Sequence, residues 1–208
     1  ISCNDGVITS ADRSNNSLNL SNGEDSASLS TDYSSYNADV MTLLNIRPVW
    51  NAGFCGYGFR RPTVAVMDSG VAGFNSGTSI YPMHKDLNYN RIPYAYKDNA
   101  YAYYYDDNGH GTFVIGEIAA IRNNGLGVNG LMPQVTILPC KVFGTDGEGE
   151  TSASINMLET LTYYENVDVV NMSFSSFNYS DAFQIACNEA AAEGMILVAA
   201  AGNDGSNW

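Results

Sequence analysis

One stretch of the 208-residue sequence, TVAVMDSG at residues 63–70, decides the class of fold. Its β-branched and apolar residues suit a strand that is covered on both faces, and Asp-Ser-Gly ends the run with polar turn residues. Runs of the same kind follow at residues 135–143, 167–174 and 195–201. Between them lie helix-spaced apolar patterns at residues 111–122, 152–166 and 180–193. The alternation predicts an α/β fold, a parallel β-sheet with helices on both faces.

The amino-acid composition argues against some classes of binding partner. Nine basic residues against 22 acidic ones give a net charge of −13 and a calculated pI near 4.2. Such a surface repels phosphate backbones and anionic lipid, so no nucleic-acid partner is expected. The longest apolar run, residues 195–201, is far too short to span a bilayer.

The four cysteines show no C-x-x-C spacing, which argues against a zinc site. Cys140 and Cys187 lie in apolar surroundings and are expected to be buried thiols. Cys3 and Cys55 could pair in an oxidising compartment, and the sequence leaves this open.

The chain divides into a polar arm and a folded part. Residues 1–39 contain ten Ser, six Asn and six acidic residues against a single basic one, which predicts an extended arm. The folded part is expected to be residues 40–208. Apolar spacing over residues 38–50 predicts a short helix at the boundary, which Pro48 would end. A long insertion, residues 72–108, carries six tyrosines between Tyr94 and Tyr105, which could line a substrate cleft or pack over the sheet edge.

Chemically useful residues follow the predicted strands. Parallel sheets bind ligands at the carboxyl ends of their strands, which here carry Asp68, residues 171–175 and residues 202–203. His110 lies at the expected start of the helix that follows the insertion. A carboxylate beside a histidine can fix the imidazole tautomer and leave Nε2 as a general base. Each residue alone is more often a cap or a turn residue, and their convergence on one edge favours a site.

These segments resemble the subtilisin-like serine proteases. Residues 64–71 are similar to the family's aspartate motif, and residues 108–116 to its His-Gly-Thr-x-x-x-Gly motif. Residues 171–173 resemble the strand that binds substrate backbone, and residues 199–203 the segment of the oxyanion asparagine. The resemblance covers about residues 45–208, so residues 40–208 are expected to be the N-terminal part of such a catalytic domain.

The resemblance implies a role for each matching position. Asp68 would orient the histidine, His110 would act as general base and acid, and Asn203 would donate to the oxyanion. The remaining positions would contact the substrate. The substrate would pair as an added strand with Ser173, Phe174 and Ser175, and one wall of its side-chain pocket would be formed by Ala200, Ala201 and Gly202.

The resemblance also implies a structural Ca²⁺ ion. Its ligands would be the Asp86 carboxylate, the Asn124 side-chain oxygen and three backbone carbonyls, those of Arg122, Leu126 and Val128. The alternative is a glycine-rich turn with no ion, and Lys85 stands where the family often has proline.

One part of the family pattern is missing. The nucleophilic serine of the family lies well downstream of the oxyanion asparagine, and only five residues follow Asn203 here. The serine is therefore expected on a second polypeptide that also completes the sheet, with proteins or peptides as substrates. The alternative is a non-catalytic fragment or pseudoprotease that binds peptides or regulates a partner.

Two further expectations concern location and specificity. Calcium, a processed start and possible disulfides suit a secreted or cell-surface protein. Three acidic residues of the insertion, Asp98, Asp106 and Asp107, suggest a preference for basic side chains in the substrate.

Overall fold

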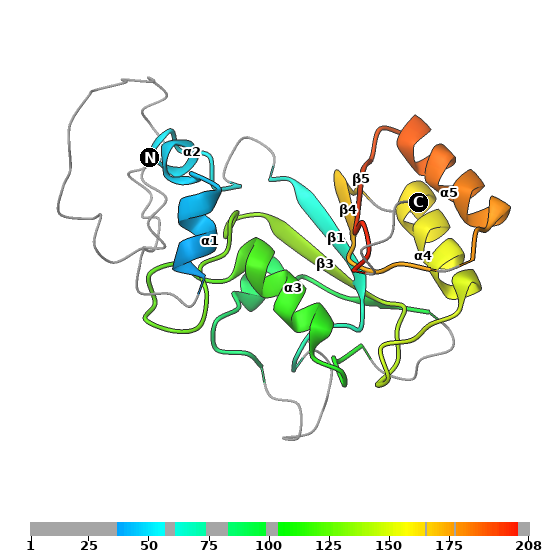
Figure 1. Cartoon of the computed structure of the whole chain (residues 1–208), viewed down its shortest axis with the longest axis horizontal. Helices are drawn as coiled ribbons and strands as arrows, with labels where there is room; N and C mark the ends of the chain where they lie inside the picture. The colour runs from blue at the N-terminus through cyan, green and yellow to red at the C-terminus, as the bar shows by residue number, and fades with distance from the viewer. Residues whose placement is uncertain are drawn as a thin grey trace.

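The computed structural model describes residues 37–56, 61–73, 83–98, 104–164, 166–176 and 178–203. Its core is one five-stranded sheet in the order β2-β3-β1-β4-β5, and every pairing is parallel (Figure 1). The strands are β1 Thr63–Asp68, β2 Tyr96–Lys97, β3 Thr136–Lys141, β4 Val169–Met172 and β5 Ile196–Ala199. The predicted α/β fold is confirmed.

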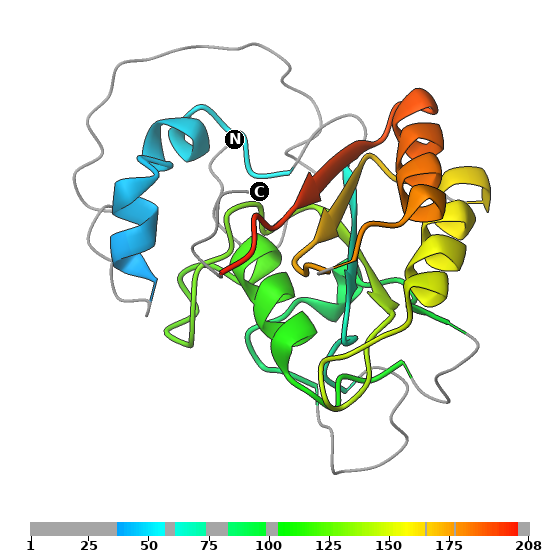
Figure 2. The ribbon, with the colours of Figure 1, turned by 45° about the vertical axis from the view of Figure 1, so that its right-hand side comes forward.

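Helices cover both faces of the sheet (Figures 1 and 2). The α3 helix, His110–Ala119, packs on one face, and α4, Thr151–Tyr164, and α5, Asp181–Ala192, pack on the other. The alternation of β1 matches these layers. Val64 and Val66 lie in the α3 cluster, while Ala65 and Met67 lie in the α4–α5 cluster. A strand buried on both faces reads as the continuous apolar run seen in the sequence.

The amino-terminal segment contains two short helices, α1 Ala38–Leu43 and α2 Arg47–Asn51. The expectation of one helix ended by Pro48 is wrong. Pro48 lies in the first turn of α2, where a residue without an N–H costs no helical hydrogen bond. The boundary expected between residues 39 and 40 falls inside α1, and residues 1–36 of the predicted arm lie outside the described residues.

The insertion contributes one of the two edge strands of the described sheet. It contains a 3₁₀ turn, Tyr89–Arg91, and β2, which pairs with β3. The rings of Tyr94 and Tyr96 meet edge to face at 5.7 Å, and Tyr105 forms a bridge with Val71. The described tyrosines therefore pack at the sheet edge, and Tyr94 also lines a hollow there. Residues 74–82 and 99–103 lie outside the described residues.

The cysteines fall into two groups. Cys55 is disulfide-bonded, whereas the side chains of Cys140 and Cys187 are thiols. Cys3, its candidate partner in the sequence, lies outside the described residues. Cys140 is fully buried, and partial burial raises the pKa of the Cys187 thiol. Among the described helices, none is long and apolar enough to cross a membrane.

Candidate active site

The strand register brings the predicted residues to one edge of the sheet. Val66 of β1 lies level with Asn171 of β4, which lies level with Val198 of β5. Two residues further along each strand stand Asp68, Ser173 and Ala200. Because neighbouring strands are about 4.8 Å apart, these three positions span about 10 Å. The carboxyl edge of the sheet is therefore a continuous row of the residues that the motifs single out.

Asp68 and His110 form a hydrogen-bonded pair at this edge. Nδ1 of His110 lies 2.9 and 3.0 Å from the two carboxylate oxygens of Asp68. An ionised carboxylate only accepts, so Nδ1 carries the shared proton and Nε2 is left as the second ring nitrogen. The Asp68 side chain is 2% exposed and that of His110 is 52% exposed. The imidazole thus faces solvent while its carboxylate partner is buried.

Two glycines permit this close approach. Gly109, the residue before α3, has φ 105°, a left-handed conformation that favours glycine. Gly111 packs so closely on Gly70 that a Cβ atom would collide with the Gly70 carbonyl oxygen. The Asp-Ser-Gly and His-Gly-Thr motifs therefore fit against each other through their glycines, which places His110 over Asp68.

A second buried carboxylate, Asp106, lies beneath the pair. Its oxygens accept hydrogen bonds from Ser69 Oγ at 2.8 Å, from the Gly109 N–H at 2.8 Å and from the Thr112 N–H at 2.8 Å. Burial alone would raise the pKa of Asp106, but the hydrogen bonds from Thr112, Gly109 and Ser69 outweigh it and lower the pKa. Sequence reasoning assigned Asp106 to substrate recognition and missed this role, although its position four residues before the histidine was visible.

Its neighbour Asp107 is engaged by a buried lysine. Lys141, 2% exposed at the end of β3, lies 2.7 Å from Asp107 Oδ1 and donates to the Ser69 carbonyl at 2.6 Å. Burial of Asp106 and pairing of Asp107 correct the expectation that both acids recognise basic substrate side chains. Sequence reasoning did not identify Lys141, because nothing in an apolar strand pattern marks its last residue as a buried cation.

The predicted substrate-binding residues are more open. Ser175, Ala200, Ala201 and Asn203 are exposed, and Gly202 has φ 83°. Ser173 is half-buried and accepts from the Asn171 amide at 2.8 Å. The Phe174 ring packs edge to face on Phe143 at 4.9 Å, against the α4–α5 core, and its predicted pairing with substrate backbone stays a prediction.

The predicted calcium ligands converge on one loop after α3. The buried Asp86 carboxylate accepts from Asn124 Nδ2 at 2.7 Å and from the Val128 N–H at 2.9 Å. The Arg122 side chain is directed elsewhere, with its guanidinium 3.6 Å from the centre of the Trp50 ring. Among the described residues no three His, Cys, Asp or Glu side chains converge, so a cation here would depend on amide and carbonyl oxygens.

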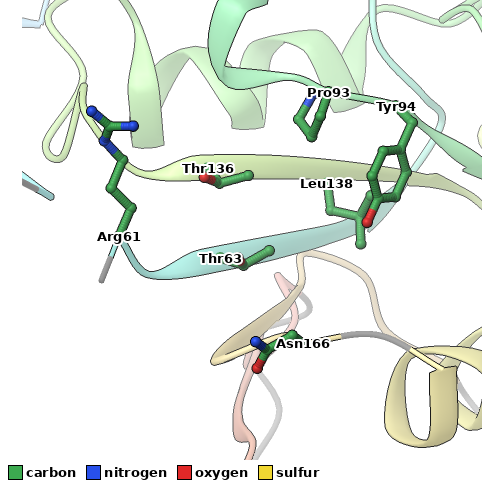
Figure 3. Close-up of a pocket in the computed structure, with 7 residues that line it drawn as sticks. All are labelled: Arg61, Thr63, Pro93, Tyr94, Thr136, Leu138 and Asn166. Carbon is green, nitrogen blue, oxygen red and sulfur yellow. The ribbon is translucent and has the colours of Figure 1, made fainter. Parts of the chain in front are cut away.

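Two hollows lie in different parts of the described structure. One, of about 260 Å³, opens at the amino ends of the strands and is lined by Arg61, Thr63, Thr136, Asn166 and three apolar or aromatic residues (Figure 3). Because Thr63 and Thr136 begin their strands, this hollow is at the far edge from Asp68. The other, of about 420 Å³, lies along α3 and is lined partly by Thr112, Asp86 and Val128. Its lining includes the proposed calcium ligand Asp86 and neither member of the Asp68–His110 pair.

Fold and site together define a class of protein: an α/β protein with a paired aspartate and histidine at the carboxyl edge of its parallel sheet. The model of the subtilase family matches residues 60–207. The chain belongs to the subtilase family.

Curated relatives agree with this assignment. The minor extracellular protease Epr of Bacillus subtilis (strain 168) is 32% identical over 167 residues, 78% of this chain and 23% of that protein. A thermostable alkaline protease of Halalkalibacterium halodurans is 35% identical over 166 residues, 79% of this chain and 41% of that protein. Subtilisin DY of Bacillus licheniformis is 36% identical over 152 residues, 73% of this chain and 51% of that protein. The chain thus spans from about a quarter to half the length of these relatives.

Proposed function

We propose that this chain supplies the aspartate, the histidine and the oxyanion asparagine of a serine endopeptidase, and that a second polypeptide supplies the serine. The observation that carries the proposal is the Asp68–His110 pair, with Nδ1 2.9 Å from the carboxylate and the ring half-exposed at the sheet edge. An imidazole held through Nδ1 presents Nε2 to solvent, where an incoming hydroxyl could reach it.

Each step of the reaction then has a group to perform it. Nε2 of His110 takes the proton of the serine hydroxyl as its oxygen attacks the peptide carbonyl, and Asp68 stabilises the imidazolium that forms. The Asn203 amide donates to the oxyanion of the tetrahedral intermediate. His110 next gives its proton to the leaving amine, the C–N bond breaks, and water repeats the cycle on the acyl-enzyme.

The β5 strand supports the need for a further segment. It is the outermost strand on its side of the described sheet, and Ile196 and Val198 are 61% and 48% exposed. An apolar edge strand of this kind is a template for pairing with another strand. A segment that carries the serine and pairs with β5 would cover these side chains and complete the substrate cleft.

The test is intact-mass spectrometry of the natively purified protein after reaction with a fluorophosphonate probe for activated serines. We expect a second polypeptide to co-purify and to carry the probe mass alone. As a matched control, His110→Gln should co-purify with the same polypeptide and leave it unlabelled. An unlabelled 22.4 kDa chain by itself would favour the alternative of a non-catalytic, peptide-binding member of the family.

We also propose a structural Ca²⁺ ion at Asp86. The donors fit a hard cation, since the Asp86 carboxylate and the Asn124 amide are 2.7 Å apart and both are side-chain oxygen donors after rotation of the amide. Backbone carbonyls of Arg122, Leu126 and Val128 would complete the set. When bound, the ion would neutralise the buried Asp86 carboxylate and hold the loop against α3.

We further propose that the protein acts outside the cell or at its surface. The disulfide of Cys55 supports an oxidising compartment. The printed name of Epr describes an extracellular protease, which is consistent with this location.

A further inference from the structure

We infer that Asp106 is a positioning residue, which sets the place of His110 relative to Asp68. The inference rests on the proposed function, because the place of His110 matters for chemistry only if it is the base. Asp106 is 6% exposed and is not itself in hydrogen-bond contact with the His110 ring within the described contacts. It acts through residues on either side of the pair.

On the histidine side, Asp106 holds the first turn of α3. Oδ1 accepts from the N–H groups of Asn108 at 3.1 Å and Gly109 at 2.8 Å, and Oδ2 accepts from the Thr112 N–H at 2.8 Å. The Thr112 hydroxyl donates to Oδ2 as well. One carboxylate therefore satisfies backbone donors on both sides of His110, groups that a helix start otherwise leaves unpaired.

On the aspartate side, Asp106 holds the residue after Asp68. Ser69 Oγ donates to Asp106 Oδ1 at 2.8 Å and accepts from the Gly111 N–H at 2.9 Å. The Ser69 N–H in turn donates to Asp68 Oδ1 at 2.7 Å. Ser69 is 1% exposed, so this link is closed to water. The two catalytic candidates are thus joined by a second, buried route that runs through Asp106.

The arrangement requires a carboxylate rather than an amide. All five groups that contact Asp106 are donors, and they use both oxygens. An asparagine offers one accepting oxygen and one donating NH₂ group. In Asp106→Asn, therefore, the NH₂ group replaces one accepting oxygen and points at hydrogen-bond donors that have lost their acceptor. The first turn of α3 or the Ser69 link then loosens, and the His110 ring loses its fixed direction.

Nuclear magnetic resonance of the 208-residue chain can test this without any activity. The chain contains two histidines, His84 and His110, so ¹⁵N-histidine labelling gives two imidazole signals that His110→Gln assigns. We expect the wild-type Nδ1 proton of His110 to exchange slowly with water. In Asp106→Asn it should exchange about tenfold faster, the loss expected for one hydrogen bond of ordinary strength.

Two further variants keep the test decisive. Asp181→Asn removes an exposed carboxylate from the first turn of α5, far from the pair in the fold, and should leave His110 unchanged. Ser69→Ala removes only the hydroxyl between Asp106 and β1, and should shift His110 in the same direction as Asp106→Asn. If Asp106→Asn does not fold, the exchange rate of the His110 Nδ1 proton in Ser69→Ala tests the inference alone.

The outcomes separate positioning from general support of the fold. A larger acceleration of exchange, relative to the wild type, at His110 Nδ1 than at the backbone amides of β1 supports the inference. An unchanged Nδ1 exchange rate in the folded variants, or an equal acceleration at every amide, overturns it. Should the complete protease be assembled, Asp106→Asn should lower kcat with KM unchanged. A failure of the proposed function would remove that kinetic result and leave the resonance result intact.

Discussion

The two halves of the candidate site differ in how much of each is buried within this chain. In the β1–α3 half, Asp68, Ser69, Asp106 and Lys141 are each 6% exposed or less. In the β4–β5 half, Ala200, Ala201 and Asn203 are exposed. The first half is held by hydrogen bonds within the chain, whereas the second presents backbone and side chains to solvent. The Asp68–His110 pairing is thus an internal property of this fold, whereas the proposed substrate binding would depend on a segment that covers β5.

This difference has a measurable consequence. We call the β1–α3 half the closed half and the β4–β5 half the open half. A substitution in the closed half should lower the free energy of unfolding as well as activity, because it leaves buried groups without partners. A substitution in the open half should lower activity alone. Each experiment below tests one side of this contrast.

The largest effect is expected at Lys141, in the closed half. Lys141→Met leaves the Ser69 carbonyl and Asp107 without the buried ammonium, and removing one partner of a buried ion pair costs about 3–5 kcal/mol. Urea unfolding followed by circular dichroism measures the loss. Lys85→Met, at an exposed lysine, should change the free energy of unfolding little. A loss at Lys141 no larger than at Lys85 would contradict the description of the closed half.

The contrast also separates what the sequence predicts from what it does not. Apolar runs and glycine-flanked motifs place Asp68 and His110 at one sheet edge, since parallel pairing follows from the alternation of strands and helices. The roles of Asp106 and Lys141 depend on contacts across 37 and 72 positions of the chain, which no local pattern encodes. Pro48 was misassigned because proline both ends and begins helices. The short β2 strand was missed because two residues are too few to show a period.

In the open half, the largest expected effect is at Asn203. Asn203→Ala in the complete protease should lower kcat about 10²–10³-fold, which is the cost of removing this kind of oxyanion donor from subtilisin itself. The unfolding midpoint of the 208-residue chain should not move, because Asn203 is exposed. Asn188→Ala, on the exposed surface of α5, serves as the control for loss of an amide. A drop in stability at Asn203 would show that the open half is also part of the folded core.

A smaller effect is expected from calcium at Asp86, which lies between the two extremes. Asp86 is as buried as Asp68 but accepts only two hydrogen bonds among the described contacts of its carboxylate. Free Ca²⁺ at one hundred times its Kd should raise the free energy of unfolding by about 2.7 kcal/mol, and a chelator should reverse this. Asp86→Asn should abolish the response, whereas Asp146→Asn, at an exposed acid, should keep it. A response that survives Asp86→Asn would place the ion elsewhere.

The smallest effect concerns the acid stability of the closed half. Hydrogen bonds from Thr112, Gly109 and Ser69 lower the pKa of Asp106 against the opposing effect of burial, so the folded state binds its proton less readily than the unfolded state. The stability that Asp106 contributes is therefore full above its unfolded pKa near 3.8 and is lost as the pH falls through the folded pKa. One such group changes the slope of stability against pH by at most about 1.4 kcal/mol per pH unit. The midpoint temperature of thermal unfolding, measured between pH 6 and pH 2, should therefore fall less steeply with pH in Asp106→Asn than in the wild type. The control Asp181→Asn should follow the wild type. Parallel curves for Asp106→Asn and the wild type would mean that the protonated carboxyl group holds the first turn of α3 as well as the carboxylate does.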